Sequence, residues 1–346
     1  MRLKNIVIMK AVFLVRNGVA ASAFSIREIE TPRPEAGQVL IKVDAFGLNF
    51  ADVMARNGMY KEAPPLPCVL GYDVAGTVEE VGSGVNNVKP GDRVTAMTRF
   101  GGYAEYAITD ARAIAIIPGN LDAGAATAIT TQYCTAYFAA LEMVNLHPGD
   151  KVLIQSGAGG VGTALIQLAK HKGCEIFSTA GSEEKLQYLR SMGVHHPINY
   201  TSHDFEKVIK KITGGTGVDV IFDAVGGKSV KKGFRLLTSG GRIVCFGAAD
   251  MSNRNIAGKI KAALDFGIYH PVMLMMPSKS MIGINMLRVA DDHPHIIKRC
   301  LEGVVRLIEE GIFSPAIGKI FPVSEIAAAH EYLEKRKSIG KVAVIW

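Results

Sequence analysis

The sequence is poor in cysteine and tryptophan. Its 346 residues include five cysteines and a single tryptophan. The cysteines lie far apart along the chain, and they are Cys68, Cys134, Cys174, Cys245 and Cys300. No two of them have the short spacing of a zinc knuckle or a redox pair. This pattern argues against a disulfide framework and predicts reduced thiols in an intracellular protein.

Long apolar runs are also missing. No segment reaches the roughly 18 consecutive apolar residues that a transmembrane helix requires. The apolar run within residues 1–9 is too short for the core of a signal peptide. Because the first clear strand begins at Met9 and Lys10, Met9 is a candidate for the natural start. These features predict a cytoplasmic protein with no transmembrane segment, and they leave a peripheral membrane contact open.

Positive charge is in modest excess and is spread along the chain. The formal net charge is +7, and the densest charged block, Glu334–Lys337, is typical of a solvated helix face. Without a basic cluster and with one tryptophan, the sequence does not predict nucleic-acid binding. A small positive excess suits an anionic cofactor.

The first part of the chain is predicted to be a β-rich, partly barrel-like domain. Gly, Pro and Asn separate alternating or apolar runs at Lys10–Val15, Val39–Phe46, Val74–Val81, Arg93–Ala96 and Tyr103–Ile108. The pattern changes near Asp122, which is predicted to cap a short Ala-rich helix. A longer helix is predicted over Thr131–Val144.

After Pro148-Gly149-Asp150, apolar strands alternate with amphipathic helices. The predicted strands are Lys151–Gln155, Glu175–Thr179, Val218–Phe222, Arg242–Phe246, Met281–Met286 and Lys341–Ile345. The predicted helices begin at Gly160 and Ser182, or cover Lys228–Leu237, His295–Glu310 and Ser324–Lys337. Such alternation predicts a parallel sheet with helices on both faces, a doubly wound α/β domain.

The segment 251–279 has a less regular pattern. It combines a helical stretch, Ile256–Leu264, with the apolar run Pro271–Met276. Buried packing or a dimer surface is the favoured interpretation, and a lipid or partner contact is the alternative.

A glycine-rich loop gives the strongest local signal. Gly157, Gly159 and Gly162 form a G-x-G-x-x-G that follows an apolar strand and opens a helix, which is the context that dinucleotide binding needs. The glycines allow a tight turn and close approach of the backbone to a pyrophosphate at the helix N-terminus. Gly160 and Val161 complete the predicted loop, whose alternative is a plain flexible turn.

The end of the second strand distinguishes NADPH from NADH. An NAD site needs an acidic residue there for the ribose 2′-hydroxyl, but this strand ends in Ser178-Thr179-Ala180-Gly181-Ser182. Ser182 and Lys185 are predicted to hold a 2′-phosphate, and Tyr200 to complete the pocket. Ser182 is also a helix N-cap candidate, and the two roles are compatible. The predicted cofactor is NADPH.

Several ordered motifs carry a family resemblance. They are Gly47–Asp52, Gly71–Val78, Val81–Val94, Ala158–Gly162, Thr135–Tyr137 and Gly340–Val342. With these motifs the chain resembles the zinc-independent quinone oxidoreductases of the medium-chain dehydrogenase/reductase superfamily. Within that family it is similar to the branch of the synaptic vesicle amine-transport-like membrane protein, especially over Gly47–Tyr60.

The resemblance implies a two-domain α/β fold. A GroES-like catalytic domain is expected over 9–128, rejoined by 288–346, with a Rossmann NADPH-binding domain over 129–287. It also implies a homodimer joined through the edge strand Met281–Met286.

The resemblance further implies a site without metal. Zinc-dependent relatives use Cys, His and Cys, and the corresponding positions here hold Asn49, Tyr72 and Thr131. An amide, a phenol and a hydroxyl do not replace two thiolates and an imidazole. The four closely spaced cysteines of a structural zinc lobe are missing too, so no zinc is expected.

Asn49 and Tyr60 are the candidate catalytic residues. Asn49 is expected to donate its amide hydrogen to a developing oxyanion or to the nicotinamide, with a helix-capping role as the alternative. Tyr60 is expected to be a proton donor or aromatic wall, with a loop anchor as the alternative. Met54 replaces a tyrosine found in some relatives, which weakens the transfer of detailed substrate contacts. Asp52 is predicted to be a structural hydrogen-bonding partner rather than an acid.

The family pattern also provides further contacts to the cofactor. Thr135 and the Phe246-Gly247 turn are expected to line the nicotinamide and ribose, and Gly283 to Asn285 to close over them. The leading prediction is an NADPH-dependent reductase of quinones or α,β-unsaturated carbonyls. The alternative is an NADPH-binding, membrane-associated trafficking or binding protein with little catalytic activity, and a zinc alcohol dehydrogenase is a distant third.

Overall fold

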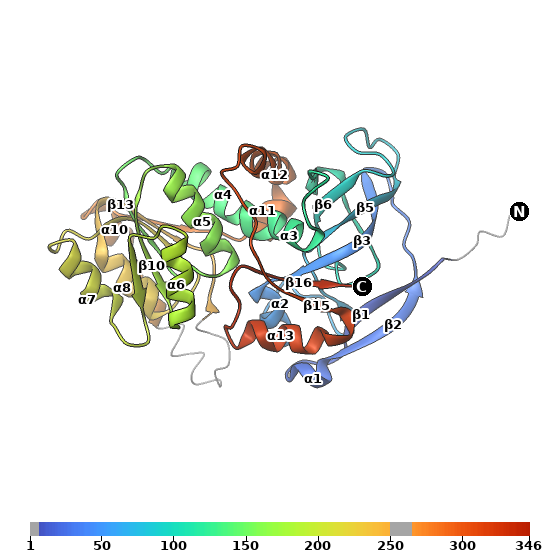
Figure 1. Ribbon diagram of the computed structural model, residues 1–346, viewed down its shortest axis with the longest axis horizontal. Helices are drawn as coiled ribbons and strands as arrows, with labels where there is room; N and C mark the ends of the chain where they lie inside the picture. The colour runs from blue at the N-terminus through green and yellow to red at the C-terminus, as the bar shows by residue number, and fades with distance from the viewer. Residues whose placement is uncertain (1–6, 250–264) are drawn as a thin grey trace, which may run out of the picture. The chain divides into compact units, whose positions relative to one another are not determined.

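The chain folds into two compact units. The computed structural model describes residues 7–249 and 265–346. The first unit comprises Met1–Cys134, Met286–Gly311 and Pro315–Trp346, and the second comprises Thr135–Asn285 with Ile312–Ser314. The first unit is thus made from both ends of the chain (Figure 1).

The first unit is built on a largely antiparallel seven-stranded sheet. Its order is β15-β16-β3-β5-β6-β8, with β7 also paired to β3. The strands are β3 (Gln38–Leu48), β5 (Asp73–Val81), β6 (Arg93–Met97), β7 (Tyr106–Asp110), β8 (Ile114–Ile116), β15 (Ile317–Pro322) and β16 (Lys341–Ile345). Antiparallel pairing of β16 with β3 joins the C-terminal strand to the β-rich N-terminal region.

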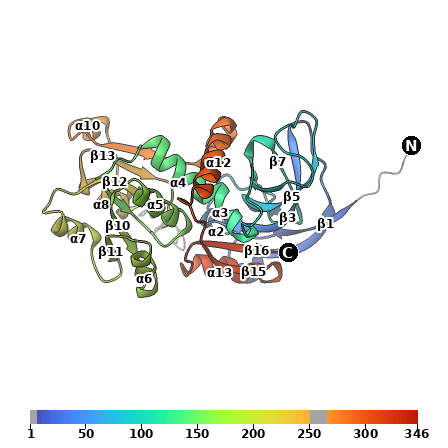
Figure 2. The same cartoon turned by 45° about the horizontal axis from the view of Figure 1, so that its top comes forward.

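A smaller sheet and several helices complete the first unit. The sheet has the order β2-β1-β4, formed by β1 (Ile8–Leu14), β2 (Phe24–Glu30) and β4 (Cys68–Val69). The helices are α1 (Ala20–Ala23), α2 (Phe50–Arg56), α3 (Ala123–Ala128), α11 (Met286–Asp292), α12 (Pro294–Glu309) and α13 (Ile326–Glu334). The single tryptophan, Trp346, donates its indole N–H to the Ala104 carbonyl (3.0 Å), and Figure 2 shows this C-terminus beside β1.

The second unit is a six-stranded parallel sheet of order β11-β10-β9-β12-β13-β14. Its strands are β9 (Lys151–Ile154), β10 (Glu175–Ala180), β11 (His196–Asn199), β12 (Val218–Asp223), β13 (Leu237–Cys245) and β14 (Ser280–Gly283). The connecting helices are α5 (Gly160–His171), α6 (Glu183–Ser191), α7 (Phe205–Ile212) and α8 (Lys228–Leu236). The strand order reverses beside β9, as in doubly wound dinucleotide-binding sheets. The predicted GroES-like and Rossmann architecture is therefore confirmed.

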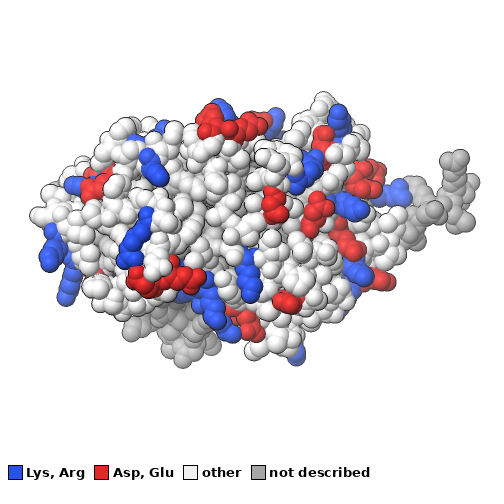
Figure 3. Space-filling view, in the orientation of Figure 1, with Lys and Arg blue, Asp and Glu red and all other residues white. Residues whose placement is uncertain are grey.

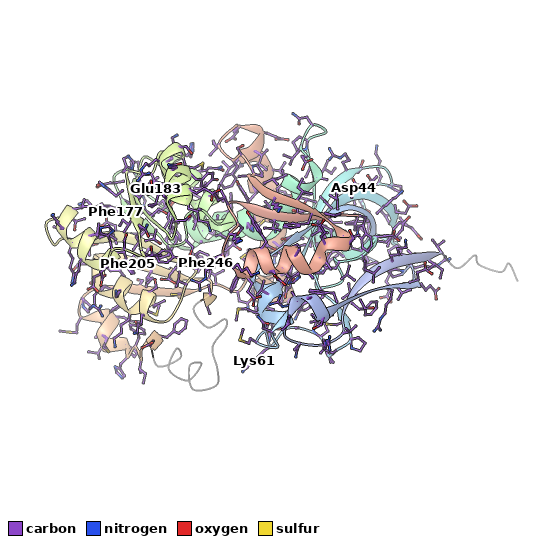
Figure 4. All side chains as sticks on the ribbon, turned by 60° about the horizontal axis from the view of Figure 1, so that its bottom comes forward. Asp44, Lys61, Phe177, Glu183, Phe205 and Phe246 are labelled. Atoms are coloured by element: carbon purple, nitrogen blue, oxygen red, sulfur yellow. The ribbon has the colours of Figure 1, made fainter. Side chains whose placement is uncertain are left out.

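The core of the second unit explains why the strand patterns predicted it well. Leu153, Ile221 and Ile243 are fully buried because both faces of a parallel sheet are covered. Phe177 and Phe205, labelled in Figure 4, belong to the same apolar cluster.

Three local predictions need correction or stay outside the described residues. The helix predicted over Thr131–Val144 is instead α4 (Cys134–Tyr137) between two π-helical segments, Ile129–Tyr133 and Phe138–Met143. The strand predicted over Met281–Met286 ends at Gly283, because α11 begins at Met286. The helical stretch predicted over 256–264 lies outside the described residues.

The apolar run Pro271–Met276 forms the short helix α10 (Pro271–Met275), none of whose residues is buried. The prediction that this run is buried in the chain's own core is therefore wrong for α10. The alternatives of a dimer surface and of a partner or lipid contact stay open. Elsewhere on the surface, basic and acidic side chains are interspersed over the face shown in Figure 3.

Candidate active site

The glycine-rich loop forms the turn between β9 and α5. Ser156 adopts a positive φ of 56° there, and the chain turns directly into the helix at Gly160. A Cβ on Gly162 would lie 2.6 Å from the Ser156 carbonyl oxygen and 2.7 Å from Gly157 Cα. Both are backbone atoms that cannot move aside, so this helix packs against its loop only with glycine at this position.

The first turn of α5 is open to an anion. Gly159 occupies the N-cap position and has no side chain to accept hydrogen bonds from the helix N–H groups that follow. Those N–H groups belong to Gly160, Val161 and Gly162, three of the predicted loop residues. Unsatisfied N–H groups at the positive end of a helix are the usual donors to a pyrophosphate.

The three residues predicted to hold a 2′-phosphate follow neighbouring strands. Ser182 follows β10 and caps α6, where its hydroxyl accepts the backbone N–H of Lys185 (3.4 Å). Tyr200 follows β11, and its hydroxyl oxygen lies 2.5 Å from the point where a Cβ on Gly181 would stand. The structure therefore brings Ser182, Lys185 and Tyr200 to one end of the sheet.

The first carboxylate after β10 is engaged elsewhere. Glu183 forms an ion pair with Arg190 at 2.6 Å on the exposed side of α6, and Figure 4 labels its position. Neither Gly181 nor Ser182 carries an acidic group for a ribose 2′-hydroxyl. This end of the sheet thus offers a hydroxyl, an ammonium and a phenol rather than a carboxylate.

The other predicted cofactor residues of this unit follow the remaining strands. Phe246 and Gly247 follow β13, and Gly283 ends β14, with Asn285 two residues further along. A Cβ on Gly247 would lie 2.4 Å from the Ala224 carbonyl oxygen, so the turns after β12 and β13 touch through their backbones. All these positions share the carboxyl edge of the parallel sheet, where doubly wound folds bind ligands. Thr135 belongs to α4 and is buried.

Asn49 is held through its backbone and its side chain. It occupies the N-cap position of α2, and its backbone N–H donates to Asp52 Oδ2 (2.7 Å). Its amide Nδ2 donates to Asp73 Oδ2 (2.5 Å), and its Oδ1 accepts from Lys341 Nζ (3.1 Å). Nδ2 carries a second hydrogen that neither bond uses.

Asp73 is the centre of this cluster. Its Oδ1 accepts the hydroxyls of Thr130 (2.6 Å) and Thr131, while Oδ2 accepts from Lys341 and Asn49. The side chains of Asp73 and Lys341 are both completely inaccessible to solvent. A charged pair survives such burial only when hydrogen bonds satisfy its remaining lone pairs, as they do here.

Gly47 makes room for the buried ammonium. A Cβ at Gly47 would stand 2.6 Å from Lys341 Nζ and 2.9 Å from the Thr127 hydroxyl. The glycine of the Gly47–Asp52 motif therefore has a steric reason: without a side chain at this position, Lys341 can reach from β16 to Asn49.

Tyr60 lies on the loop after α2, beside Tyr72. The two rings meet edge to face with centroids 6.2 Å apart, and burial raises the pKa of both phenols above the usual value. Both hydroxyls thus stay protonated at neutral pH and are able to donate hydrogen bonds.

A hollow of about 210 Å³ opens beside Tyr60. It is lined by Leu14, Asn17, Ala55, Gly58, Tyr60, Ala63, Pro64, Pro65 and Leu66. Glu62, on the same loop, binds Arg99 (3.2 Å) and Arg288 (2.7 Å). These ion pairs fix the loop that forms one wall of the hollow.

Asp52 and His330 are buried ionisable groups behind these residues. Burial raises the pKa of Asp52 to about 7, against a partial lowering by the Asn49 N–H bond. Burial lowers the pKa of His330 to about 3, and its Nε2 lies 3.2 Å from the Tyr103 hydroxyl. Asp52 is thus held by Asn49, as predicted, but in a site where its neutral form is favoured.

The positions that bind catalytic zinc in related enzymes hold a different set of contacts. Asn49 and Thr131 both bond to Asp73, and Tyr72 packs against Tyr60. Within residues 7–249 and 265–346, no three His, Cys, Asp or Glu side chains come together as metal ligands would.

Sequence reasoning missed Asp73, Thr130 and Lys341 as parts of the site. Lys341 opens an apolar strand, Lys-Val-Ala-Val-Ile, and a lysine in such a strand needs a buried partner. That signal indicates a partner without saying which carboxylate it is.

Two protein-family models match the chain. The Alcohol dehydrogenase GroES-like domain matches residues 35–119, and the Zinc-binding dehydrogenase family matches residues 160–302. With the two sheets described above, these matches define an oxidoreductase that has a GroES-like domain and a Rossmann domain.

Curated relatives cover nearly the whole chain. The synaptic vesicle membrane protein VAT-1 homolog of Rattus norvegicus is 34% identical over 91% of this chain and 78% of its own length. The 2-haloacrylate reductase of a Burkholderia species is 31% identical over 92% and 93%, respectively. Quinone oxidoreductase-like protein 2 of Bos taurus is 32% identical over 90% and 86%.

Solved structures agree with these relatives. Escherichia coli quinone oxidoreductase complexed with NADPH superposes with a TM-score of 0.86 at 26% identity, covering 97% of this chain and all of that one. The CurK enoyl reductase superposes with a TM-score of 0.85 at 28% identity, covering 98% and 99%. The chain therefore belongs to the quinone oxidoreductase family of the medium-chain dehydrogenase/reductase superfamily.

Relatives in this family include both reductases and a protein named for a vesicle membrane. In the part of the present chain that the structure describes, no helix has the length and apolar character needed to span a bilayer.

Proposed function

We propose that this protein is a zinc-independent, NADPH-dependent reductase that transfers hydride to a quinone or an α,β-unsaturated carbonyl. The observation that carries the proposal is the Asn49 amide, fixed by Asp73 and Lys341 with one N–H unused. Hydride addition to such an acceptor creates an oxyanion, and a preorganised N–H donor stabilises it.

The chain's own residues fit NADPH. The open first turn of α5 suits the pyrophosphate, and Gly162 has no space for a Cβ that would push helix and loop apart. Ser182, Lys185 and Tyr200 suit a 2′-phosphate. When bound, the cofactor supplies the hydride. Support also comes from related structures, since the matching E. coli enzyme was solved with NADPH.

The acceptor site is proposed around Asn49 and Tyr60. Asn49 donates a hydrogen bond to the acceptor oxygen, and Tyr60, whose phenol is protonated at neutral pH, is the proton donor or aromatic wall. The hollow beside Tyr60, which has both apolar and polar lining residues, is proposed to hold part of a planar, electron-poor acceptor. Thr135, Phe246, Gly247, Gly283 and Asn285 are proposed to line the nicotinamide end.

The proposal is tested by titrating the protein with NADPH and NADH and then following absorbance loss with 1,2- and 1,4-quinones and short enones. Acceptor-dependent oxidation of NADPH is the expected result. NADPH binding without turnover on any of these acceptors would instead favour the second candidate below.

Lys185→Ala tests the cofactor preference. Loss of a charge-assisted bond to the 2′-phosphate is expected to weaken NADPH binding by about tenfold or more, while NADH binding stays unchanged. Fluorescence titration measures both constants. Lys207→Ala, which removes an exposed lysine from α7, is the matched control and should change neither. Equal affinity of the wild type for the two cofactors would refute the roles of Ser182, Lys185 and Tyr200.

A homodimer and a two-domain organisation are parts of the proposal. β14 is an edge strand of its sheet, and the neighbouring helix α10 exposes Val272, Met273 and Met275. We propose that a second copy of the chain covers this edge. The predicted domains, 9–128 with 288–346 and 129–287, are proposed as the catalytic and cofactor-binding parts.

The second candidate is an NADPH-binding, membrane-associated trafficking or binding protein. The exposed apolar side chains of α10 and the vesicle-membrane name of a relative favour it. Flotation with liposomes tests this candidate, and binding that is lost in Met275→Glu would support it. The cytoplasmic location stays a prediction, as does the absence of a nucleic-acid partner.

A further inference from the structure

Lys341 and Asp73 surround an amide that the proposed reaction uses. We propose that both are positioning residues, which hold the Asn49 side chain in one of its two amide orientations so that its free N–H serves the acceptor. The inference rests on the proposed function, because it assigns the control of the same donor. The inference adds the buried Asp73–Lys341 ion pair to the proposed active site. These two residues are 268 positions apart in the sequence.

The contacts select one orientation of the amide. Lys341 has only donors and faces Oδ1 at 3.1 Å, while the Asp73 carboxylate has only acceptors and faces Nδ2 at 2.5 Å. Turning the amide by 180° would place its NH₂ group against the ammonium and its carbonyl against the carboxylate. Both contacts would then be repulsive, so the flipped orientation is excluded.

The ion pair is itself fixed. The hydroxyls of Thr130 and Thr131 donate to the other Asp73 oxygen. The absence of a side chain at Gly47 leaves the space that Lys341 occupies. Since neither charged side chain is accessible to solvent, no water competes for these bonds.

The ion pair acts on the donor strength of the amide in two opposite ways. Lys341 beside Oδ1 draws electron density from the amide nitrogen, whereas the bond from Nδ2 to the Asp73 carboxylate returns electron density to it. The ion pair is therefore proposed to act through the orientation of the amide rather than through its donor strength.

A double-mutant cycle tests the inference. Lys341→Met with Asp73→Asn removes both charges together and leaves no unpaired buried ion. With NADPH and 1,4-benzoquinone, this double variant is expected to lower kcat about tenfold, with the NADPH dissociation constant within about twofold of wild type. In an Asn49→Ala background the same double change is expected to lower kcat no further, because its target amide is gone.

The matched control removes another buried ion pair of the same unit. Arg56 and Glu334 are 2.7 Å apart, and the Arg56 side chain is 1% exposed. Arg56→Met with Glu334→Gln is expected to lower the melting temperature and to leave kcat unchanged. Fluorescence of Trp346, the single tryptophan, reports whether the first unit is folded in every variant.

The outcomes separate the inference from the proposed function. An equal loss of kcat with and without the Asn49 amide would overturn the positioning role alone. A kcat unchanged in the folded Lys341→Met/Asp73→Asn protein would do the same. An Asn49→Ala protein as active as wild type would overturn the role of Asn49 in the proposed function and the inference with it.

Discussion

Asn49→Ala is expected to lower kcat by about 100-fold, which is the usual cost of removing one preorganised donor to an oxyanion. The bonds to Lys341 and Asp73 already hold the Asn49 amide in one orientation. No reorganisation of the amide is therefore needed when the oxyanion forms. NADPH binding should change little if the N–H serves the acceptor. Steady-state kinetics with a quinone and a fluorescence titration with NADPH measure the two effects.

Asn57→Ala is the matched control for this substitution. Asn57 lies at the C-cap of the same helix, α2, and its amide donates to Glu334 Oε1 at 3.0 Å. The change removes the same side chain from the other end of the helix and should leave kcat as it is. If Asn49→Ala instead raised the NADPH dissociation constant and left kcat intact, the amide would serve the nicotinamide rather than the oxyanion.

The sequence predicted the Rossmann unit better than any other part. Strands such as β9 and β12 are dominated by apolar residues, because helices cover both faces of the sheet, and the glycine loop marks where the first helix begins. The strand β2 was not predicted, since four of its seven residues are polar or charged and its apolar residues, Phe24, Ile26 and Ile29, do not keep a strict alternation. Asp122 was correctly predicted as an N-cap, because a capping side chain acts on neighbours along the chain.

The rest depends on contacts between distant residues or on hydrogen-bond register. Apolar periodicity does not distinguish π-helical segments from an α-helix, so 129–143 was predicted as one regular helix. The Asp73–Lys341 ion pair links β5 to β16. The residues that neighbour each of them in the sequence do not indicate that these two side chains pair. The family resemblance predicted Asn49 and Tyr60 as site residues. The need for glycine at position 47 became clear only from the structure, where the Lys341 side chain occupies the space of a Cβ.

The effects of Asp52 and His330 on the pH dependence of the free energy of unfolding should become visible only when one of the two residues is replaced. The pKa of Asp52 is about 7 in the fold against an ordinary value of 3.8, so Asp52 favours the folded state at low pH and loses that contribution as pH rises from about 4 to 7. The pKa of His330 is about 3 against 6.5, so its contribution is present above pH 6.5 and is lost as pH falls toward 3. Between about pH 4 and 6.5 the two trends oppose each other.

We therefore expect each single variant to expose the other group. Asp52→Asn, whose side-chain oxygen still accepts the Asn49 N–H, should lose stability with falling pH through this window because His330 alone remains. His330→Phe should lose stability with rising pH because Asp52 alone remains. Each slope should approach about 1.4 kcal/mol per pH unit, and at pH 8 Asp52→Asn should be more stable than wild type.

Urea unfolding followed by Trp346 fluorescence at a series of pH values measures these slopes in the unit that contains both groups. His196→Gln is the control, because that histidine lies in the other unit, where it pairs with Glu175. Parallel pH profiles for wild type and both variants would mean that neither group changes its proton affinity on folding. Opposite slopes would show that between pH 4 and 6.5 Asp52 takes up a proton on folding while His330 releases one. The two groups together then exchange no net proton with solvent, because the fold buries a protonated acid and a neutral imidazole.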